Sequence, residues 1–300
     1  MAAESFKSYL TGRKKTVDSA LQKFLPTSRT RPSTIHEAMR YSLFAGGKRL
    51  RPILTLAACE ACGGKMERAM PAAAAVECIH TYSLIHDDLP CMDDDDFRRG
   101  QPTSHTKYGE GIAVLAGDAL LTIAFEILAQ TKPAPKCRYS VADFVLDLAD
   151  ASGSRKLIGG QVLDLEGEGQ DVQLSPTQLR YIHESKTAAL LTSSVRLGGM
   201  AANATPMKLQ ALTDFGYSVG LAFQIIDDIL DVTQSSEQLG KSAGKDVATD
   251  KSTYPAMFGL EKSRKEATRL TRKALKAVGV FGENGERLEQ IAHYLLDRDY

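Results

Sequence analysis

Two clusters of aspartates stand out because each follows a run of apolar residues. Asp227, Asp228 and Asp231 lie in the stretch Phe223–Asp231 (FQIIDDILD). At about 100° per residue, a helix places Asp227 and Asp231 on one face, with Asp228 on its flank. Like charges this close repel, and a helix holds them among apolar neighbours only when cations neutralise them. Oxygen ligands without His or Cys select hard ions, so we expect Mg²⁺ here, with phosphates as the remaining ligands.

The other cluster is denser and lies earlier in the chain. Six aspartates and two arginines fall within the thirteen residues from Asp87 to Arg99. Asp88 and Asp93 are five residues apart, about 140° around an ideal helix, so an unbroken helix would not place them on one face. The proline between them disfavours helical backbone at the residue before it. We therefore predict that residues 89–92 bulge out and return Asp93 to the pair of aspartates.

Basic residues accompany both aspartate clusters. A glycine-rich turn, Gly46–Pro52 (GGKRLRP), carries three cations ahead of a predicted helix. Arginine grips phosphate oxygens in a bidentate way, and lysine acts as a mobile point charge. Any one of these residues fits an ordinary surface cation, but two carboxylate clusters that are each followed by cations fit a site that holds diphosphates. Arg98 and Arg99 follow the earlier cluster, and Lys241, Lys245 and Lys251 follow the later one.

The elements that would position these groups are helical. Apolar residues at three- and four-residue steps predict an amphipathic helix from Phe6 to Phe24. Residues 72–86 and 113–129 are predicted to be interior helices that are apolar on most sides. No run alternates polar and apolar residues with β-branched enrichment, so we expect no sheet. Because no Ser/Gly-rich linker divides the chain, we expect one all-α domain over residues 1–300, with about ten or more helices.

Prolines mark the predicted helix starts. In Ser175-Pro176 and Thr205-Pro206, a capping residue precedes a first-turn proline, whose missing N–H costs nothing there. The proline-rich segment 131–136 predicts a loop. Three more prolines are also taken to precede helical stretches, namely Pro52, Pro71 and Pro255.

The chain closely resembles the short-chain trans-isoprenyl diphosphate synthases, which make farnesyl or geranylgeranyl diphosphate, from about Ile35 to Leu296. The resemblance implies an all-α isoprenoid synthase bundle around a central cavity. It also implies a prenyltransferase that condenses isopentenyl diphosphate with dimethylallyl or geranyl diphosphate. The motifs that carry it are, in order, GGKRLRP at Gly46–Pro52, HDDLPCMDDDDFRRG at His86–Gly100, AGDALL at Ala116–Leu121, HESKT at His183–Thr187 and FQIIDDILD at Phe223–Asp231.

The resemblance further implies a role for each matching residue. The aspartates Asp87, Asp88, Asp93, Asp227, Asp228 and Asp231 would hold about three Mg²⁺, with Mn²⁺ as an alternative, on the allylic diphosphate. Groups that clamp the leaving diphosphate match Arg98, Lys186, Lys241 and Lys251, and groups that bind isopentenyl diphosphate match Lys48, Arg51, His80 and Arg99. Polar groups near the developing allylic cation match Thr187 and Gln224. Departure of the diphosphate in a dry pocket leaves a cation that the second substrate's double bond attacks, so no protein nucleophile is required.

Product length is the finer question. In the family that the chain resembles, the residue five positions before the first aspartate lies beneath the allylic tail, and here it is Tyr82, followed by Ser83. A phenol at that depth should stop growth beyond farnesyl, so farnesyl diphosphate is the expected product. Plastid and cyanobacterial geranylgeranyl synthases share much of the first motif, including Cys91, so geranylgeranyl diphosphate is the alternative.

Three other activities compete with this interpretation. A class I terpene cyclase also ionises an allylic diphosphate, but it would not need a second diphosphate site at Lys48 and Arg51. A non-catalytic subunit of a heteromeric synthase would usually lack one aspartate cluster, and this chain has both. An HD-type metal phosphohydrolase would need more spaced histidines than His86 beside its aspartate. We interpret His86 as an ordinary packed histidine.

Composition limits the partners and the compartment. The 37 Lys and Arg residues balance 37 Asp and Glu residues, which removes the electrostatic drive for generic nucleic-acid binding. Asp118 and Glu126 interrupt the longest apolar tract, so we expect no transmembrane segment. Five cysteines and no signal-peptide pattern favour a reducing compartment, the cytoplasm, or the plastid stroma for a mature plant chain. Cys59 and Cys62 form a CxxC without the second half of a zinc site. The family resemblance implies a homodimer.

Overall fold

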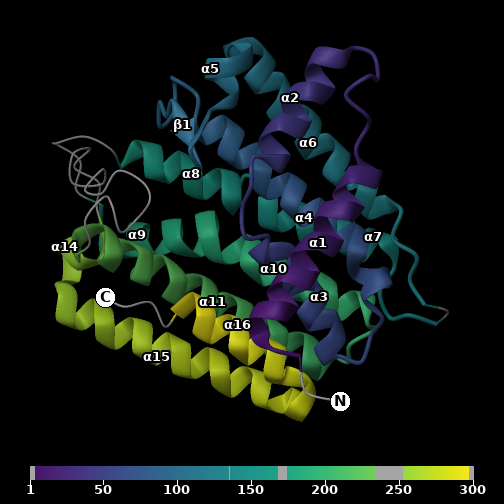
Figure 1. Cartoon of the computed structure of the whole chain (residues 1–300). Coiled ribbons are helices and arrows are strands. Elements are labelled where there is room, and N and C mark those ends of the chain that lie inside the picture. Colours follow the sequence, from purple (N-terminus) through teal and green to yellow (C-terminus); the bar gives the residue numbers. More distant parts are fainter. Residues whose placement is uncertain (1–3, 135, 168–173, 234–252, 297–300) are drawn as a thin grey trace.

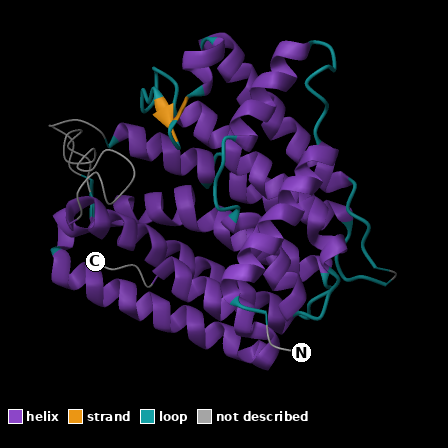
Figure 2. Ribbon diagram, in the orientation of Figure 1, coloured by secondary structure: helices purple, strands orange, loops and turns teal. Residues whose placement is uncertain are grey.

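Helices make up nearly all of the regular structure in the computed structural model, which describes residues 4–134, 136–167, 174–233 and 253–296 (Figures 1 and 2). The all-α prediction is confirmed. The α-helices are α1 (Phe6–Phe24), α2 (Ser33–Phe44), α3 (Leu50–Ala61), α4 (Met66–Asp87), α5 (Ser104–Tyr108), α6 (Glu110–Ala129), α7 (Val141–Ser152), α8 (Leu157–Glu166), α9 (Pro176–Ile182), α10 (Ala189–Ala201), α11 (Pro206–Thr233), α14 (Tyr254–Phe258), α15 (Leu260–Val278) and α16 (Glu286–Leu296). A π-helical turn, η1 (His183–Ala188), joins α9 to α10, and a 3₁₀ turn, η2 (Gly279–Gly285), joins α15 to α16.

Local sequence signals explain several of these boundaries. Helix α1 buries Tyr9, Val17 and Leu21 from the predicted apolar stripe. At the start of α9, the Ser175 hydroxyl accepts a hydrogen bond from the Gln178 N–H at 3.3 Å, and Pro176 occupies the first turn as predicted. The predicted loop around residues 131–136 lies between α6 and α7. Capping and proline placement therefore decide where these helices begin.

The helices pack around two apolar clusters. One gathers side chains of α4 and α6 with parts of α1, α2, α7 and α10, and the other gathers side chains of α11, α15 and α16 with parts of α3 and α10. In Figure 1, α15 runs along one edge of the molecule and α11 lies beside it, while α4 and α6 lie on the far side of α10. Helices α3 and α10 contact each other and take part in both clusters, so they connect the two halves of the core.

Three details differ from the sequence-based expectations. A two-residue antiparallel ladder pairs β1 (Phe97–Arg98) with β2 (Gln101–Pro102), because φ is positive at both turn residues, Arg99 and Gly100. Two residues are too few to produce an alternating pattern. Pro71 lies inside α4 rather than ahead of it. Helix α6 is not interior on most sides, since Val114 and Leu115 are 40% and 54% exposed.

Candidate active site

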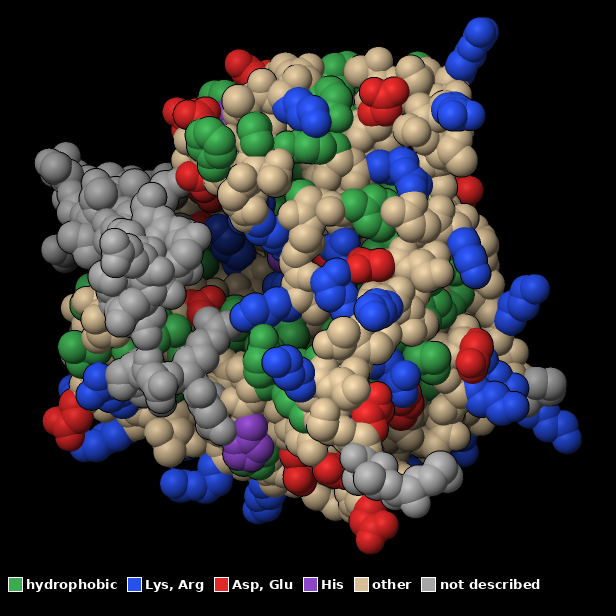
Figure 3. All heavy atoms as spheres, in the orientation of Figure 1, with side chains coloured by type: hydrophobic (Ala, Val, Ile, Leu, Met, Phe, Trp, Pro, Cys, Tyr) green, Lys and Arg blue, Asp and Glu red, His purple; other side chains and the backbone are tan. Residues whose placement is uncertain are grey.

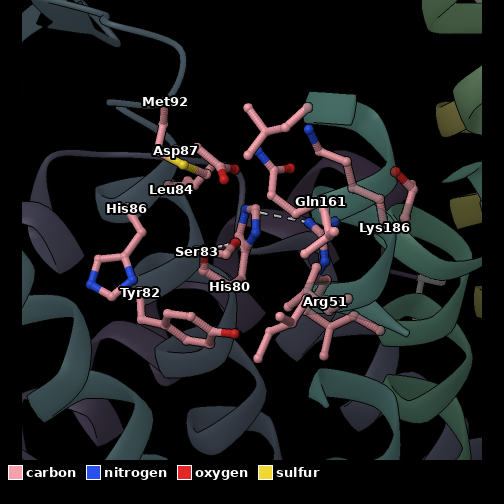
Figure 4. A pocket seen from close by; sticks show the side chains of 16 residues that line it. Arg51, His80, Tyr82, Ser83, Leu84, His86, Asp87, Met92, Gln161 and Lys186 are labelled. Atoms are coloured by element: carbon pink, nitrogen blue, oxygen red, sulfur yellow. Dashed lines mark hydrogen bonds between the residues drawn. The ribbon is translucent and has the colours of Figure 1, made fainter. Parts of the chain in front are cut away.

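A cavity of about 390 Å³ lies between α4 on one side and α8 and η1 on the other. Figure 3 shows that this face of the molecule is hollowed and that Lys and Arg side chains gather in and around the hollow. The lining changes from polar to apolar. Its polar residues are Arg51, His80, Ser83, His86, Asp87, Gln161, Lys186 and Thr187, and its apolar or aromatic residues are Tyr82, Leu84, Met92, Leu157, Ile158, Val162, Leu165 and Leu190 (Figure 4).

The first aspartate cluster forms where α4 ends. The N–H of Asp93 donates to the carbonyl of Asp87 at 2.8 Å, and the N–H of Asp95 donates to the carbonyl of Asp88 at 3.3 Å. The chain therefore leaves the helix after Asp88 and folds back, which confirms the predicted bulge. Only this return brings Asp93 beside the helical pair, because their spacing does not fit one face of a helix.

Burial raises the pKa of Asp87 to about 6. The nearby Lys186 ammonium opposes this rise, while the carboxylates of Asp93 and Asp88 add to it. Asp88 is buried and accepts hydrogen bonds from the Arg98 guanidinium, from Nε at 2.8 and 2.9 Å and from Nη2 at 2.5 Å. The α4 cluster is thus a crowded group of carboxylates that only cations can stabilise in the charged form.

The second aspartate cluster lies within α11, one turn from its end. Asp228 and Asp231 are buried, and Asp227 is half-buried. Asp228 accepts hydrogen bonds from the Gln224 amide at 3.0 Å and from the Tyr254 backbone N–H at 2.9 Å. The Oδ2 atom of Asp231 is buried and makes no hydrogen bond within the part of the chain that the structure describes. An unpaired buried carboxylate oxygen is costly, so Asp231 is suited to a cation that arrives with the substrate.

The π-helical turn η1 connects the cavity to the second cluster. The Thr187 hydroxyl, which lines the cavity, donates to the Gln224 Oε1 atom at 2.8 Å, and the Gln224 amide in turn donates to Asp228. The aspartates of α11 are not themselves part of the cavity wall as described. Asp228 lies behind Thr187 and Gln224, and the charge of Asp227 acts on Arg51, where it opposes the lowering of the Arg51 pKa by burial.

Lys186 points into the cavity from the same turn (Figure 4). Its ammonium lies 2.6 Å from the Oδ2 atom of Asp164, a buried carboxylate on α8. A Cβ at Gly160 would lie 2.5 Å from the Lys186 backbone nitrogen, so a glycine is required where α8 crosses η1. These contacts set the direction of the Lys186 side chain.

A group of basic residues gathers around Arg51 and His80 of the cavity lining, with Arg99 beside them but outside the lining. The Arg51 Nη1 atom is 3.3 Å from the His80 Nε2 atom, and the Arg99 Nη1 atom donates to the Gly46 carbonyl at 2.6 Å. The surrounding protein lowers the pKa of Arg51 mainly by burial. Burial, and then the charge of Arg51, lowers the pKa of His80 well below its usual value, so the imidazole is neutral at pH 7. The group is cationic through its guanidinium ions alone, which suits an anionic ligand.

The comparisons with known proteins agree with this geometry. A family model described as polyprenyl synthetase matches residues 32–294. The chain belongs to the polyprenyl synthetase family. It is 50% identical over 297 residues to a chloroplastic geranylgeranyl pyrophosphate synthase of Capsicum annuum, covering 98% of this chain and 79% of the relative. It is 46% identical to a geranylgeranyl diphosphate synthase of Cyanophora paradoxa, covering 97% and 96%.

A solved structure also resembles the chain over its length. An FPP/GFPP synthase from Zymomonas mobilis superposes with a TM-score of 0.86 and is 35% identical, covering 97% of this chain and 98% of that one. The resemblance inferred from the motifs is therefore confirmed. This polyprenyl synthetase is a trans-prenyltransferase.

Not all of the predicted binding residues meet at the cavity. Lys48 is exposed, and its ammonium lies 5.4 Å from the Tyr294 ring centroid rather than in the cavity wall. Arg49, the second cation of the glycine-rich turn, points away from the cavity into the protein. Of the three cations in the turn, Arg51 alone lines the cavity, and buried acceptors on other helices hold Arg49. Lys241, Lys245 and Lys251 lie outside the described residues.

The proposed chain-length residues line the lower part of the cavity in Figure 4. The Tyr82 ring packs edge-on against the His86 ring, with 5.7 Å between centroids, and its hydroxyl is buried without a hydrogen-bond partner. Burial, and then the charge of Asp87, raises the pKa of that phenol to about 12. The Ser83 hydroxyl donates to the carbonyl of His80 at 3.0 Å. His86 lies 3.0 Å from the Val114 carbonyl through Nε2, which supports a packing role.

The carboxylates fit a hard metal ion only in combination with a ligand. Among the described residues, no group of three or more His, Cys, Asp or Glu side chains is arranged to hold an ion by itself. The unpaired oxygen of Asp231 and the crowded carboxylate of Asp87 are nevertheless all-oxygen donors, which Mg²⁺ prefers. Mg²⁺ commonly binds through one or two carboxylates with substrate phosphates as further ligands. The residues present therefore fit ions that enter with a diphosphate.

Sequence reasoning missed three residues of the site. Asp164 pairs with Lys186, and His183 lies 3.4 Å from Asp228 through Nε2. Gln161 lines the cavity, with both amide atoms buried and unbonded. Gln161 and Asp164 belong to a local signal, Gly159–Asp164 (GGQVLD), in which glycines precede two polar residues on one helix. A pair of glycines in a helix already indicates a close approach of backbones.

Proposed function

We propose that this polyprenyl synthetase condenses isopentenyl diphosphate with allylic diphosphates and that its product is geranylgeranyl diphosphate. The observation that carries the product assignment is the set of relatives at about half identity that are named geranylgeranyl synthases. They favour the longer product over farnesyl diphosphate, which the phenol at Tyr82 had suggested.

The cavity lining supports the longer product. The Tyr82 ring packs edge-on against His86 and lines the cavity beside its apolar side chains. Ile158 and Val162 line the cavity and are still 41% and 49% exposed. For a geranylgeranyl product, we expect the prenyl tail to pass Tyr82 and to lie along these apolar side chains of α8.

The reaction uses the two ends of the polar wall for two diphosphates. The allylic diphosphate, as it leaves, is bound by four cations, namely Lys186, Arg98, Lys241 and Lys251. About three Mg²⁺ would be held by the aspartates of the two clusters, which are Asp87, Asp88, Asp93, Asp227, Asp228 and Asp231. When bound, Mg²⁺ neutralises the charge that develops on the leaving diphosphate. Thr187 and Gln224 direct oxygen atoms toward the developing allylic cation. Arg51, His80 and Arg99 hold isopentenyl diphosphate, Lys48 joins them only if its side chain leaves the Tyr294 ring, and the apolar wall excludes water. The released diphosphate takes the proton that the coupled product loses.

Product analysis tests the assignment. The purified chain is incubated with Mg²⁺, dimethylallyl diphosphate and radiolabelled isopentenyl diphosphate, and the alcohols released by phosphatase are separated by chromatography. We expect labelled geranylgeraniol as the main alcohol. Farnesol as the final alcohol would overturn the product assignment, and an unlabelled hydrocarbon would indicate a cyclase.

We also propose a homodimer through α6 and α7. These helices expose Val114, Leu115 and Leu146, which are 40%, 54% and 66% accessible in the single chain. Among the described helices, α6 is long and apolar enough to cross a membrane by length and composition, and 44% of its apolar window is buried. A second copy packed on its exposed side explains that composition as well as a membrane does. Light scattering after gel filtration should give twice the mass of the chain. For Leu115→Glu, it should give the mass of a single chain.

We also propose a compartment for the protein, the plastid stroma. All five cysteines are free thiols, which fits a reducing compartment. Relatives that are chloroplastic by name support the plastid stroma over the cytoplasm as the location. Fluorescence microscopy of a tagged full-length protein in its own cells tests this placement.

A further inference from the structure

Arg49 occupies an unusual position in the glycine-rich turn. It is only 3% exposed, and its backbone has a φ of 54°, in the left-handed region that non-glycine residues seldom adopt. It immediately precedes α3, so its conformation determines how the turn enters that helix. Lys48 and Arg51 lie on either side of it and are the two members of the turn assigned to isopentenyl diphosphate.

Three other helices meet the Arg49 side chain. Its Nε atom donates to the Asp18 carboxylate of α1 at 2.8 Å, and its Nη1 atom donates to the Glu77 carboxylate of α4 at 2.8 Å. Its Nη2 atom donates to the Leu43 carbonyl, near the end of α2, at 2.6 Å. Glu77 is 2% exposed, so this is a buried ion pair, and each nitrogen of the Arg49 guanidinium has an acceptor. A left-handed arginine persists only where such surroundings over-determine its conformation.

The same turn also holds Arg99, the remaining member of the cation group, in place. The Gly46 carbonyl accepts from Arg99, and a Cβ at Gly47 would lie 2.6 Å from the Arg99 guanidinium. Arg99 therefore lies against the turn backbone in a place that exists only while the turn keeps this shape. Glu77 also connects the Arg49 network with the cation group, because it lies one turn before His80 on α4 and acts electrostatically on Arg51 and Arg99.

We propose that Arg49 is a positioning residue: its buried network with Asp18 and Glu77 holds the turn 46–51 in the shape that aims Arg51 into the cavity and seats Arg99. It thereby sets the affinity for the homoallylic diphosphate and leaves the aspartate clusters unchanged. This inference rests on the proposed function, because it assigns the turn to isopentenyl diphosphate. Arg49 itself does not touch the substrate.

Arg49→Lys is the main test, because lysine keeps the charge but cannot donate in three fixed directions. A small displacement of a binding group can cost up to about 100-fold, so we expect the KM for isopentenyl diphosphate to rise about 10- to 100-fold. The KM for the allylic diphosphate and kcat should change less than about threefold, since Asp87, Lys186 and α11 are not contacted. An equal rise in both KM values, a loss confined to kcat, or unchanged kinetics would overturn the proposal.

Arg196→Lys is the matched control. Arg196 likewise links an acid and a neighbouring helix, through Asp147 at 2.6 Å and Thr213 at 2.8 Å, but it lies outside the cavity. A comparable loss of thermal stability with unchanged KM values is expected for this control. If Arg196→Lys raised the KM for isopentenyl diphosphate as Arg49→Lys does, the rise would come from a general loss of structure, and the positioning role of Arg49 would be refuted.

Glu77→Gln keeps the test decisive if Arg49→Lys does not fold. The amide still offers an oxygen to Arg49 but removes the charge. If the network positions the turn, the KM for isopentenyl diphosphate rises, by less than in Arg49→Lys. If Glu77 merely offsets the charge of the arginines, the affinity for the diphosphate increases instead, and the positioning role is refuted.

Direct binding separates this inference from the proposed function. Isothermal titration of isopentenyl diphosphate into the metal-free full chain reports on the cation group alone. Binding by the wild type that weakens at least tenfold in Arg49→Lys supports the inference even if turnover yields another product. No binding by the wild type, with active turnover, would refute the assignment of the turn and hence the inference.

Discussion

The two aspartate clusters hold their carboxylates in different ways. At the end of α4, the partners are cations: Arg98 on Asp88, and Lys186 near Asp87. In α11, the hydrogen-bond donors to Asp228 among the described residues are neutral groups, the Gln224 amide and the Tyr254 backbone N–H. A charged partner can move to a diphosphate when substrate arrives, whereas an amide in a helix keeps its place. We infer that the α4 cluster rearranges on binding and that the α11 cluster is preorganised.

Asp87→Ala should have the largest effect. Asp87 lines the cavity, and its loss removes a ligand from the side that contacts substrate, so kcat/KM should fall about 10³-fold. Steady-state kinetics with saturating Mg²⁺ measure the change. Asp96→Ala, at an exposed position of the same loop, is the control and should stay near wild type. If both substitutions behaved alike, the loop as a whole rather than Asp87 would be responsible.

Asp231→Asn tests the preorganised cluster and should cost about 10²-fold in kcat. No described residue donates a hydrogen bond to its Oδ2 atom, so an amide there loses a metal ligand without breaking a hydrogen bond seen at that atom. The Mg²⁺ concentration for half-maximal activity should rise as well. An unchanged Mg²⁺ dependence would remove Asp231 from the metal site.

Asp164→Asn tests whether Lys186 needs its buried partner. The amide keeps an oxygen near the ammonium but removes the charge that holds it at 2.6 Å. Because the substrate diphosphate then meets a less ordered lysine, we expect the allylic KM to rise about tenfold. The KM for isopentenyl diphosphate should not follow it. A parallel change in both constants would show that α8 has shifted as a whole.

The smallest expected effect is on stability without metal. The pKa of Asp87 in the folded chain is about 6, above the ordinary value of 3.8, so the folded state binds the proton more tightly than the unfolded state. Its contribution is therefore present below pH 3.8 and is lost as the pH rises to about 6. Asp87→Asn should raise the Tm by a few degrees at pH 7.5 and by less at pH 4.5, measured in chelator. A larger gain at pH 4.5 would contradict this sign.

Helix type and location were readable from local patterns, but contacts between distant segments were not. The stripe of α1 and the Ser175-Pro176 start of α9 follow from spacing and capping. The exposed side of α6 could not be foreseen, because an all-apolar helix looks the same whether it is covered by its own chain or by a second copy. The inward turn of Arg49 was equally invisible, since its acceptors come from three other helices.

The residue types alone indicated the chemistry that we propose for this protein: two oxygen-only carboxylate clusters with attendant cations predict metal ions and diphosphates, and the order of the motifs indicates the family that the comparisons confirm. Charge and ligand preference are properties of side chains, so they need no coordinates. The tertiary structure decided which cations face the cavity and which one, Arg49, is buried among other helices. It also decided which apolar side chains line the cavity beside Tyr82. Those outcomes arise from contacts between segments far apart in the chain, which local spacing does not encode.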